Sequence, residues 1–226
     1  MNLKKKSIDK HYVINPFLGF LAMFFTQDIL IKFFFSEIKI QKKSIQIPKN
    51  SSIILAPTHR SRWDGLILTK AIGRRITNKD CRFMVTKSEM KGIQGWFLKR
   101  LGCFSINQLS PSFSILRYAV KLIVEKRQLV VFPEGRINKY GKKIALKEGL
   151  FRLARLATKK TSSITIIPIG IAYSEVNPKF RSKVSLCFGE PLVINEHIDL
   201  SINEFNKTLH KKMMAAENKA LNYVGR

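Results

Sequence analysis

His59 and Asp64, which have four residues between them, are the side chains of this sequence best suited to chemistry. A histidine can remove a proton from a hydroxyl group near neutral pH, and a carboxylate bonded to its other ring nitrogen stabilises the imidazolium. Positions five apart on a straight helix point about 140° away from each other. The two side chains therefore meet only if the chain bends between them, as it does where a strand end leads into a helix.

The neighbouring residues predict such a bend. An apolar run at 53–56 is typical of a buried strand, and a helical pattern follows from Gly65. Taken alone, the spacing fits a surface turn as well, and Asp64 also suits the N-cap of a helix.

A second block lies further along the chain. The apolar run 129–132 predicts a buried strand that leads directly into Pro133, Glu134, Gly135 and Arg136. Proline restricts the backbone and glycine allows it to approach a ligand closely, so the pattern is typical of a ligand-binding loop at the carboxyl end of a sheet strand.

A third block, residues 166–171, predicts another buried strand that contains a proline. In this order the three blocks resemble the glycerolipid acyltransferase family, which contains 1-acyl-glycerol-3-phosphate acyltransferase. The family's motifs correspond here to His59 and Asp64, then Phe132 to Gly135, then Ile167 to Ile169. Further likeness, within roughly residues 45–195, is found at Lys87-Ser88-Glu89, Gly95-Trp96-Phe97, Leu101-Gly102 and Phe188 to Leu192.

The resemblance implies an O-acyltransferase. His59 would accept the proton of an acceptor hydroxyl as it attacks a thioester carbonyl, and Asp64 would orient His59. The donor would be an acyl carrier protein or coenzyme A thioester, with no other cofactor and no metal. The acceptor would be a lysophospholipid, 1-acyl-glycerol-3-phosphate, which becomes phosphatidic acid.

The remaining site residues are expected to bind substrate. Glu134 would order the acceptor loop, and Gly135 would present a backbone N–H. Arg136, Arg60 and Arg62 are candidates for contacts with an anion, although a solvated face explains the last two almost as well.

Two positions depart from the family pattern. Gln108 and Ile137 stand where the family has arginines associated with the acceptor's phosphate, and a neutral amide lacks arginine's charged fork. Arg136 is placed to substitute one position earlier. The alternative is the same chemistry on a different lysolipid or another lipid acceptor.

The composition indicates the size of the fold and the kind of partner that the surface attracts. The 226 residues fit one sizeable α/β domain, and 41 Lys and Arg against 15 Asp and Glu give a net charge of +26. Such a surface attracts polyanions, whether anionic lipid, acidic protein or nucleic acid. A nucleic-acid-binding protein is the alternative from another class, but the sequence has no recognisable nucleic-acid motif.

Cysteine and histidine usage argues against a structural metal. The three cysteines form no Cys-x-x-Cys pair, which favours a reducing compartment, and the four histidines are scattered. Cys103 lies in a strand-like run and is expected to be a buried thiol.

The segment from Pro16 to Phe35 is rich in Phe, Leu and Ile, and three lysines precede it at positions 4–6. Gln27, Asp28 and Lys32 interrupt it, so its uncharged stretches are too short to span a membrane. It fits a helix lying in the membrane interface, with Asp28 and Lys32 paired on one face. The alternative is a helix that packs on the domain.

These observations predict an α/β fold with a mainly parallel sheet flanked by helices. Residues 1–45 would form an amphipathic, membrane-associating segment, and 46–226 the acyltransferase domain, held peripherally or monotopically at the cytoplasmic face. The expected strands are 52–56, 82–86, 103–106, 129–132, 164–171 and 183–188, and the expected helices are 65–73, 112–126, 145–158 and 202–222.

Overall fold

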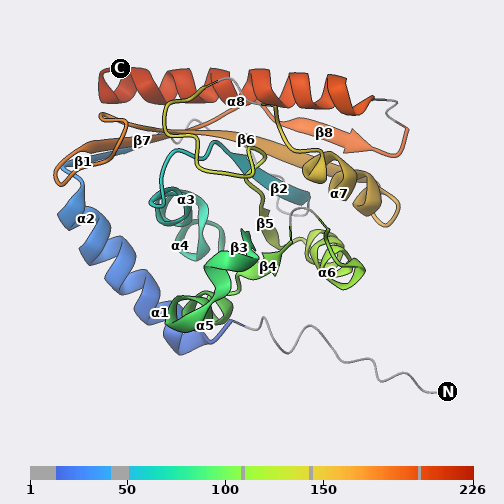
Figure 1. Ribbon diagram of the computed structural model, residues 1–226, viewed down its shortest axis with the longest axis horizontal. Coiled ribbons are helices and arrows are strands. Elements are labelled where there is room, and N and C mark those ends of the chain that lie inside the picture. The colour runs from blue at the N-terminus through green and yellow to red at the C-terminus, as the bar shows by residue number, and fades with distance from the viewer. Residues whose placement is uncertain (1–13, 42–50, 108–109, 143–144, 198–199) are drawn as a thin grey trace.

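A mixed sheet with helices on both faces forms the centre of the computed structural model, which describes residues 14–41, 51–107, 110–142, 145–197 and 200–226 (Figure 1). This confirms the predicted fold class. The strands are β1 (Glu37–Ile40), β2 (Ser52–Pro57), β3 (Cys81–Thr86), β4 (Phe104–Ile106), β5 (Gln128–Val130), β6 (Ser163–Tyr173), β7 (Lys183–Phe188) and β8 (Leu192–Asn195).

The strand order is β1-β7-β6-β2-β5-β3-β4, and β8 also pairs with β6. The five strands from β6 to β4 are parallel to one another, whereas β7 and β8 run antiparallel to β6. β1 is parallel to β7. All six predicted strands form, but the sequence reasoning missed the two short strands β1 and β8.

The helices include all four that the sequence predicted, together with short ones in stretches left unassigned. They are α1 (Pro16–Met23), the π-helix η2 (Phe24–Leu30), α2 (Ile31–Phe34), α3 (Asp64–Ile72), α4 (Arg74–Thr77), the 3₁₀-helix η3 (Lys87–Met90), α5 (Gly92–Arg100), α6 (Phe113–Val124), α7 (Gly149–Thr158) and α8 (Ile202–Val224).

Alternation along the strands divides the core into two layers. In β2, Ile54 and Ala56 face one side and pack with α6, α7 and α8, while Ile53 and Leu55 face the other side and pack with α2 and α3. Both faces of β2 are therefore buried, which explains its continuous apolar run. Figure 1 shows α8 along the first face and the N-terminal helix on the opposite side.

Pro168 lies at a change of partner along the edge of β6. On that edge residues 163–166 pair with β8 and residues 169–173 pair with β7. A proline has no N–H to donate, and in this gap it interrupts neither ladder.

The segment from Pro16 to Phe34 is helical throughout, and its outer side is apolar. Its 19 residues are long and apolar enough to cross a membrane by length and composition alone, contrary to the expectation that its uncharged stretches are too short. Ile31 and Phe35 are buried against the domain, whereas Phe17 and Phe33 are about two-thirds exposed.

Two sequence-based details of this segment need correction. Asp28 does not pair with Lys32, because its carboxylate binds the guanidinium of Arg75 through two hydrogen bonds of 2.6 and 2.7 Å. Residues 37–40, assigned to a separate N-terminal segment, form β1 within the main sheet. Trp63 packs as predicted, with its ring 4.3 Å from that of Phe34.

Candidate active site

The predicted chemical residues lie beyond the carboxyl ends of the neighbouring parallel strands β2 and β5. After β2 the chain continues into α3 on one face of the sheet, and after β5 it continues into α7 on the other face. In open α/β sheets such a divergence leaves a crevice beyond the strand ends, where ligands bind. The topology therefore brings the two predicted loops together.

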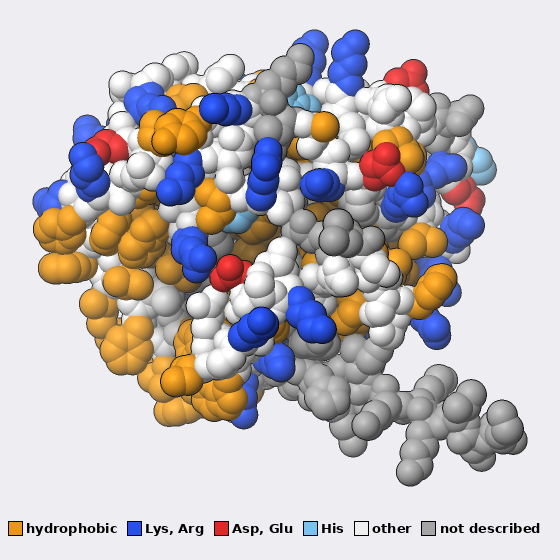
Figure 2. Space-filling model, in the orientation of Figure 1, with side chains coloured by type: hydrophobic (Ala, Val, Ile, Leu, Met, Phe, Trp, Pro, Cys, Tyr) orange, Lys and Arg blue, Asp and Glu red, His pale blue; other side chains and the backbone are white. Residues whose placement is uncertain are grey.

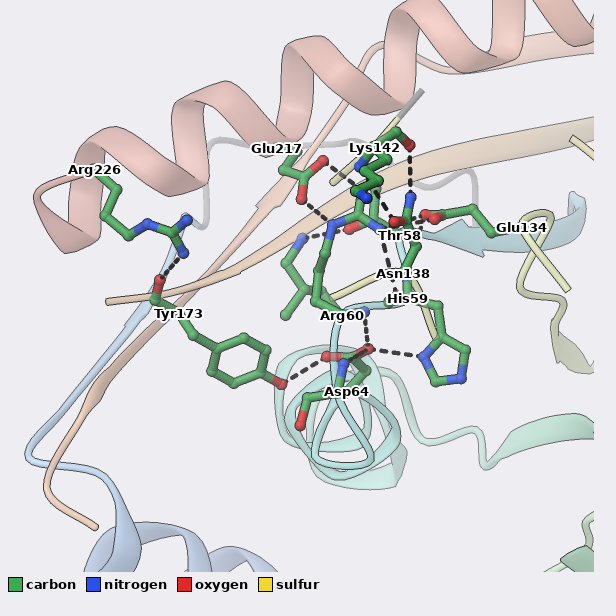
Figure 3. A network of polar contacts seen from close by, with 12 residues as sticks. Thr58, His59, Arg60, Asp64, Glu134, Asn138, Lys142, Tyr173, Glu217 and Arg226 are labelled. Carbon is green, nitrogen blue, oxygen red and sulfur yellow. Dashed lines mark hydrogen bonds and ion pairs between the residues drawn. The ribbon is translucent and has the colours of Figure 1, made fainter. Parts of the chain in front are cut away.

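His59 and Asp64 face each other across the predicted bend (Figure 3). Nδ1 of His59 lies 2.9 Å from Oδ2 of Asp64. Asp64 is fully buried as the first residue of α3, and Oδ2 also accepts hydrogen bonds from the backbone N–H groups of Arg60 and Ser61, at 2.6 and 2.8 Å. The carboxylate thus turns back toward the loop, and Asp64 is not the N-cap.

The His59 ring is held flat against Phe132 of the second block. The two ring centroids are 4.1 Å apart, and the planes differ by 27°. Because Nδ1 is engaged with Asp64, Nε2 is the nitrogen left for a substrate. The side chain is 21% exposed and lines a cavity, so a substrate hydroxyl can reach it.

Tyr173, at the end of β6, is a member of the site that sequence reasoning missed. Its hydroxyl donates to Oδ1 of Asp64 over 2.6 Å. Burial, and then the negative charge of Asp64, raise the pKa of Tyr173 well above its ordinary value, so the phenol remains a donor. No local pattern links two positions 109 residues apart.

Arg60 does not face the cavity, which corrects its assignment as an anion contact. Its Nη1 donates to both carboxylate oxygens of Glu134 at 2.8 Å, and its Nε and Nη2 donate to the carboxylate of Glu217 on α8. Burial opposes the charge on Arg60, but the hydrogen bonds and charges of Glu217 and Glu134 outweigh it and raise the pKa of the guanidinium. Its anionic partners are the chain's own carboxylates.

Glu134, Arg60 and Glu217 form a continuous buried network, which we call the clamp. Glu134 also accepts the backbone N–H of His59 at 3.1 Å, so the clamp anchors the catalytic loop directly. α8 comes this close because position 170 on β6 is glycine, where a Cβ would overlap the backbone nitrogen of Glu217. Glu217 is the second member of the site that sequence reasoning missed.

Gly135 forms a turn and does not offer its N–H to a ligand, contrary to expectation. Its φ is 69°, in the left-handed region that favours glycine, and its N–H donates to the carbonyl of Phe132 at 3.0 Å. The turn directs the following residues, Arg136 and Ile137, to the cavity wall.

Two arginines at the cavity are accessible to an anion. Arg136 is exposed, and within the described part of the chain no ion pair involves it. Arg62 is also exposed and has one long contact, 3.5 Å, with Glu89. Ile137 lines the same cavity, while Gln108 lies outside the described residues.

The cavity next to His59 has a volume of about 1770 Å³. It extends to the N-terminal helix, and many of its walls are apolar. Among the side chains lining it are Ala22, Met23, Leu66, Phe83, Met84, Val85, Phe97, Leu98, Leu101 and Val131. A space of this size and character suits a long hydrocarbon chain next to the dyad.

Cys81 and Cys103 also line the cavity but are buried thiols, as predicted for Cys103. Burial raises the pKa of each to about 12, so neither is a thiolate nucleophile near neutral pH. Over the residues that the structure describes, no group of three or more His, Cys, Asp or Glu side chains could hold a metal ion.

Comparisons with known proteins point to one family. The acyltransferase family model matches residues 38–172. A 1-acyl-sn-glycerol-3-phosphate acyltransferase of Bacillus subtilis is 24% identical over 190 residues, which cover 80% of this chain and 89% of that protein. One of Streptococcus pneumoniae is 25% identical over 150 residues, which cover 66% of this chain but only 53%, about half, of that protein.

A solved structure shares the fold. The 1-acyl-sn-glycerophosphate (LPA) acyltransferase PlsC from Thermotoga maritima superimposes with a TM-score of 0.67 at 18% identity, covering 92% of this chain and 80% of that one.

Proposed function

We propose that this chain, which belongs to the acyltransferase family, transfers a fatty acyl group from a thioester to the free hydroxyl of 1-acyl-sn-glycerol-3-phosphate. The observation that carries the proposal is the His59–Asp64 dyad beside a large, partly apolar cavity. The names of the two curated relatives support this acceptor.

In the proposed reaction, Nε2 of His59 takes the proton of the acceptor hydroxyl as its oxygen attacks the thioester carbonyl. A new C–O bond forms and the C–S bond breaks. The protonated His59 then returns the proton to the departing sulfur, so the enzyme ends unchanged. Asp64 holds the imidazole in one tautomer and stabilises its protonated form.

The acceptor's phosphate would bind at the exposed arginines of the cavity mouth. Arg136 is the better candidate, because Arg62 already contacts Glu89. A different lysolipid is the second candidate acceptor, and the apolar Ile137 in the cavity wall supports it, because it adds no charge for a phosphate.

The donor would be an acyl carrier protein or coenzyme A thioester. Both are anionic, and the net charge of +26 favours their approach. No further cofactor enters the proposed reaction.

The N-terminal helix would hold the enzyme on a membrane, where its substrates are. In Figure 2 hydrophobic side chains gather along the left edge of the molecule, where Figure 1 places this helix. The phenylalanines Phe17, Phe20, Phe25 and Phe33 are each more than half exposed. Such a patch is expected to insert into the interface of a bilayer. The free, buried cysteines suit a reducing compartment and support the cytoplasmic face for this contact.

Product analysis tests the function. Purified protein is offered an acyl thioester and a panel of lysolipids, and products are identified by mass spectrometry. We expect phosphatidic acid from 1-acyl-sn-glycerol-3-phosphate, and a fall in turnover of about 10²–10⁴-fold for His59→Ala. The matched control is His210→Ala, because His210 lies on α8 and does not line the cavity.

Normal turnover by a folded His59→Ala protein would disprove the mechanism. Products formed only from another lysolipid would support the same mechanism with a different acceptor.

A further inference from the structure

We propose that Tyr173 is a positioning residue of the acyl-transfer site, whose hydroxyl holds the second carboxylate oxygen of Asp64 and so fixes the orientation in which the first oxygen meets His59. The inference rests on the proposed function, since it assigns Tyr173 a role in that reaction.

The two oxygens of Asp64 have different partners. Oδ2 accepts from Nδ1 of His59 and from the backbone N–H groups of Arg60 and Ser61. Oδ1 accepts from Tyr173. Rotation about the Cβ–Cγ bond moves both carboxylate oxygens together, so a donor on Oδ1 resists any rotation that would carry Oδ2 away from His59. Tyr173 thus completes the alignment of the dyad.

Tyr173 is itself held firmly from several sides. It is 2% exposed, and its ring stacks on Phe35 with centroids 5.9 Å apart. Its backbone pairs with Val184 of β7, and Arg226 donates to its carbonyl over 3.0 Å. A phenol fixed in this way can impose its direction on Asp64.

The hydrogen bond should also affect the basicity of His59. A donor on Oδ1 draws negative charge away from the oxygen that faces the imidazole. Removing the donor strengthens the attraction between Asp64 and the protonated ring. A histidine must be neutral to act as a base, and the acidic limb of the pH–rate profile should then move to higher pH.

Other charged groups surround this pair and would be unchanged by the test. Arg60 is bound to Glu134 and Glu217 in the clamp, and Glu134 accepts the backbone N–H of His59. The guanidinium of Arg226 contacts the carbonyl of Tyr173, on the backbone side of that residue. The hydroxyl of Tyr173 also interacts with the side chain of Ser61, which carries no charge. A pH shift on loss of the hydroxyl therefore reports the contact between Tyr173 and the charged Asp64.

The test is Tyr173→Phe, which removes one oxygen and keeps the ring. We expect kcat to fall about 10-fold, as for loss of one hydrogen bond to a charged group, with little change in KM for acceptor or donor. We also expect the acidic limb of kcat/KM to move upward. The NMR signal of the His59 Nδ1 proton, which lies between His59 and Asp64, should also shift whether or not substrate is turned over.

The matched control is Tyr118→Phe, which removes another buried phenolic oxygen, from the core on the other face of the sheet. It should leave both kcat and the acidic limb unchanged even if it lowers the melting temperature. If Tyr173→Phe fails to fold, 3-fluorotyrosine at position 173 keeps the ring and donates more strongly, so it should move the acidic limb to lower pH.

A folded Tyr173→Phe protein with wild-type kcat and an unmoved acidic limb would overturn the proposal. Wild-type acyl transfer in the same assay would then leave the proposed function standing, so the two failures are distinguishable.

Discussion

Arg60 and Arg136 belong to the two loops that meet at the active site, and their surroundings give them opposite roles. Arg60 is 5% exposed and its guanidinium is shared between two carboxylates. Arg136 is exposed at the cavity. A charge that is buried must be paired, whereas a solvated one is available to an incoming anion. Both guanidinium groups can therefore bind an anion, and burial decides whether that anion belongs to the chain or to a substrate.

The Arg136→Ala variant tests the assignment of the phosphate contact. Loss of a charge-assisted hydrogen bond worth about 1.5–3 kcal/mol should raise KM for 1-acyl-sn-glycerol-3-phosphate about 10- to 150-fold. KM for the donor should change little. Lys139→Ala is the control, because Lys139 is an exposed cation in the same loop but does not line the cavity. Equal effects of both variants would show a general loss of charge, and no effect of Arg136→Ala would exclude it as the phosphate contact.

At the scale of elements, α8 contributes to the site although it lies outside the region matched by the family model. The match ends at residue 172, and α8 begins 30 residues later, at Ile202. It lies on β6 and β7, and Gly170 lets it approach until Glu217 reaches Arg60. The helix begins with a capping box at Ser201 and Glu204. Its secondary structure is therefore set locally, while its function depends on what it packs against.

The Glu217→Gln variant tests the clamp. It leaves buried Arg60 with one carboxylate, and breaking a buried ion pair costs about 3–5 kcal/mol, so the melting temperature should fall by about 10 °C. Turnover below the unfolding transition should also fall, because Glu134 and Arg60 anchor the His59 loop. Glu190→Gln is the control, since it removes an exposed carboxylate paired with Lys212 of the same helix. A stable Glu217→Gln protein with full activity would contradict the role of the clamp.

The N-terminal helix permits a membrane test by substitution. Deletion of residues 1–40 would also remove β1 and the buried Ile31 and Phe35, and so would damage the domain. The test instead changes Phe17, Phe20 and Phe25 together to Ser. We expect this triple variant to co-sediment less with vesicles than the wild type does. Each fully buried ring is worth about 1.5–3 kcal/mol, so three partly inserted rings predict a loss of about 10²-fold or more.

The control for this experiment is Phe113→Ser, which changes an 82% exposed phenylalanine on α6. It should leave vesicle binding unchanged. An identical loss for Phe113→Ser, or none for the triple variant, would show that the N-terminal helix is not the membrane contact.

At the scale of the whole molecule, a charge of +26 should make membrane binding dependent on salt. The Debye length falls from about 10 Å at 0.1 M to about 3 Å at 1 M, so salt screens the attraction to anionic lipids. We expect binding to anionic vesicles to weaken steeply between these concentrations, and binding to neutral vesicles to change little. Co-sedimentation measures both. Tighter salt-dependent binding to duplex DNA than to anionic vesicles would favour the nucleic-acid alternative.

The sequence by itself was sufficient for the local chemistry and for the class of fold. The spacing of His59 and Asp64 after an apolar run predicted the bend that brings them together, because a strand end and a helix start restrict the backbone locally. The continuous apolar runs predicted six strands, since strands buried on both faces have no polar alternation. The exposed phenylalanines were also foreseen, as an amphipathic helix shows its pattern in a short window.

Only the tertiary structure decided which charged and polar groups work together. Tyr173 reaches Asp64 over 109 residues and Glu217 reaches Arg60 over 157, so no local pattern carries either contact. Whether an arginine is buried or exposed depends on the elements packed around it, which is why Arg60 was misassigned. β1 was missed for the same reason, because a four-residue strand is stabilised by its partner β7 and not by its own sequence.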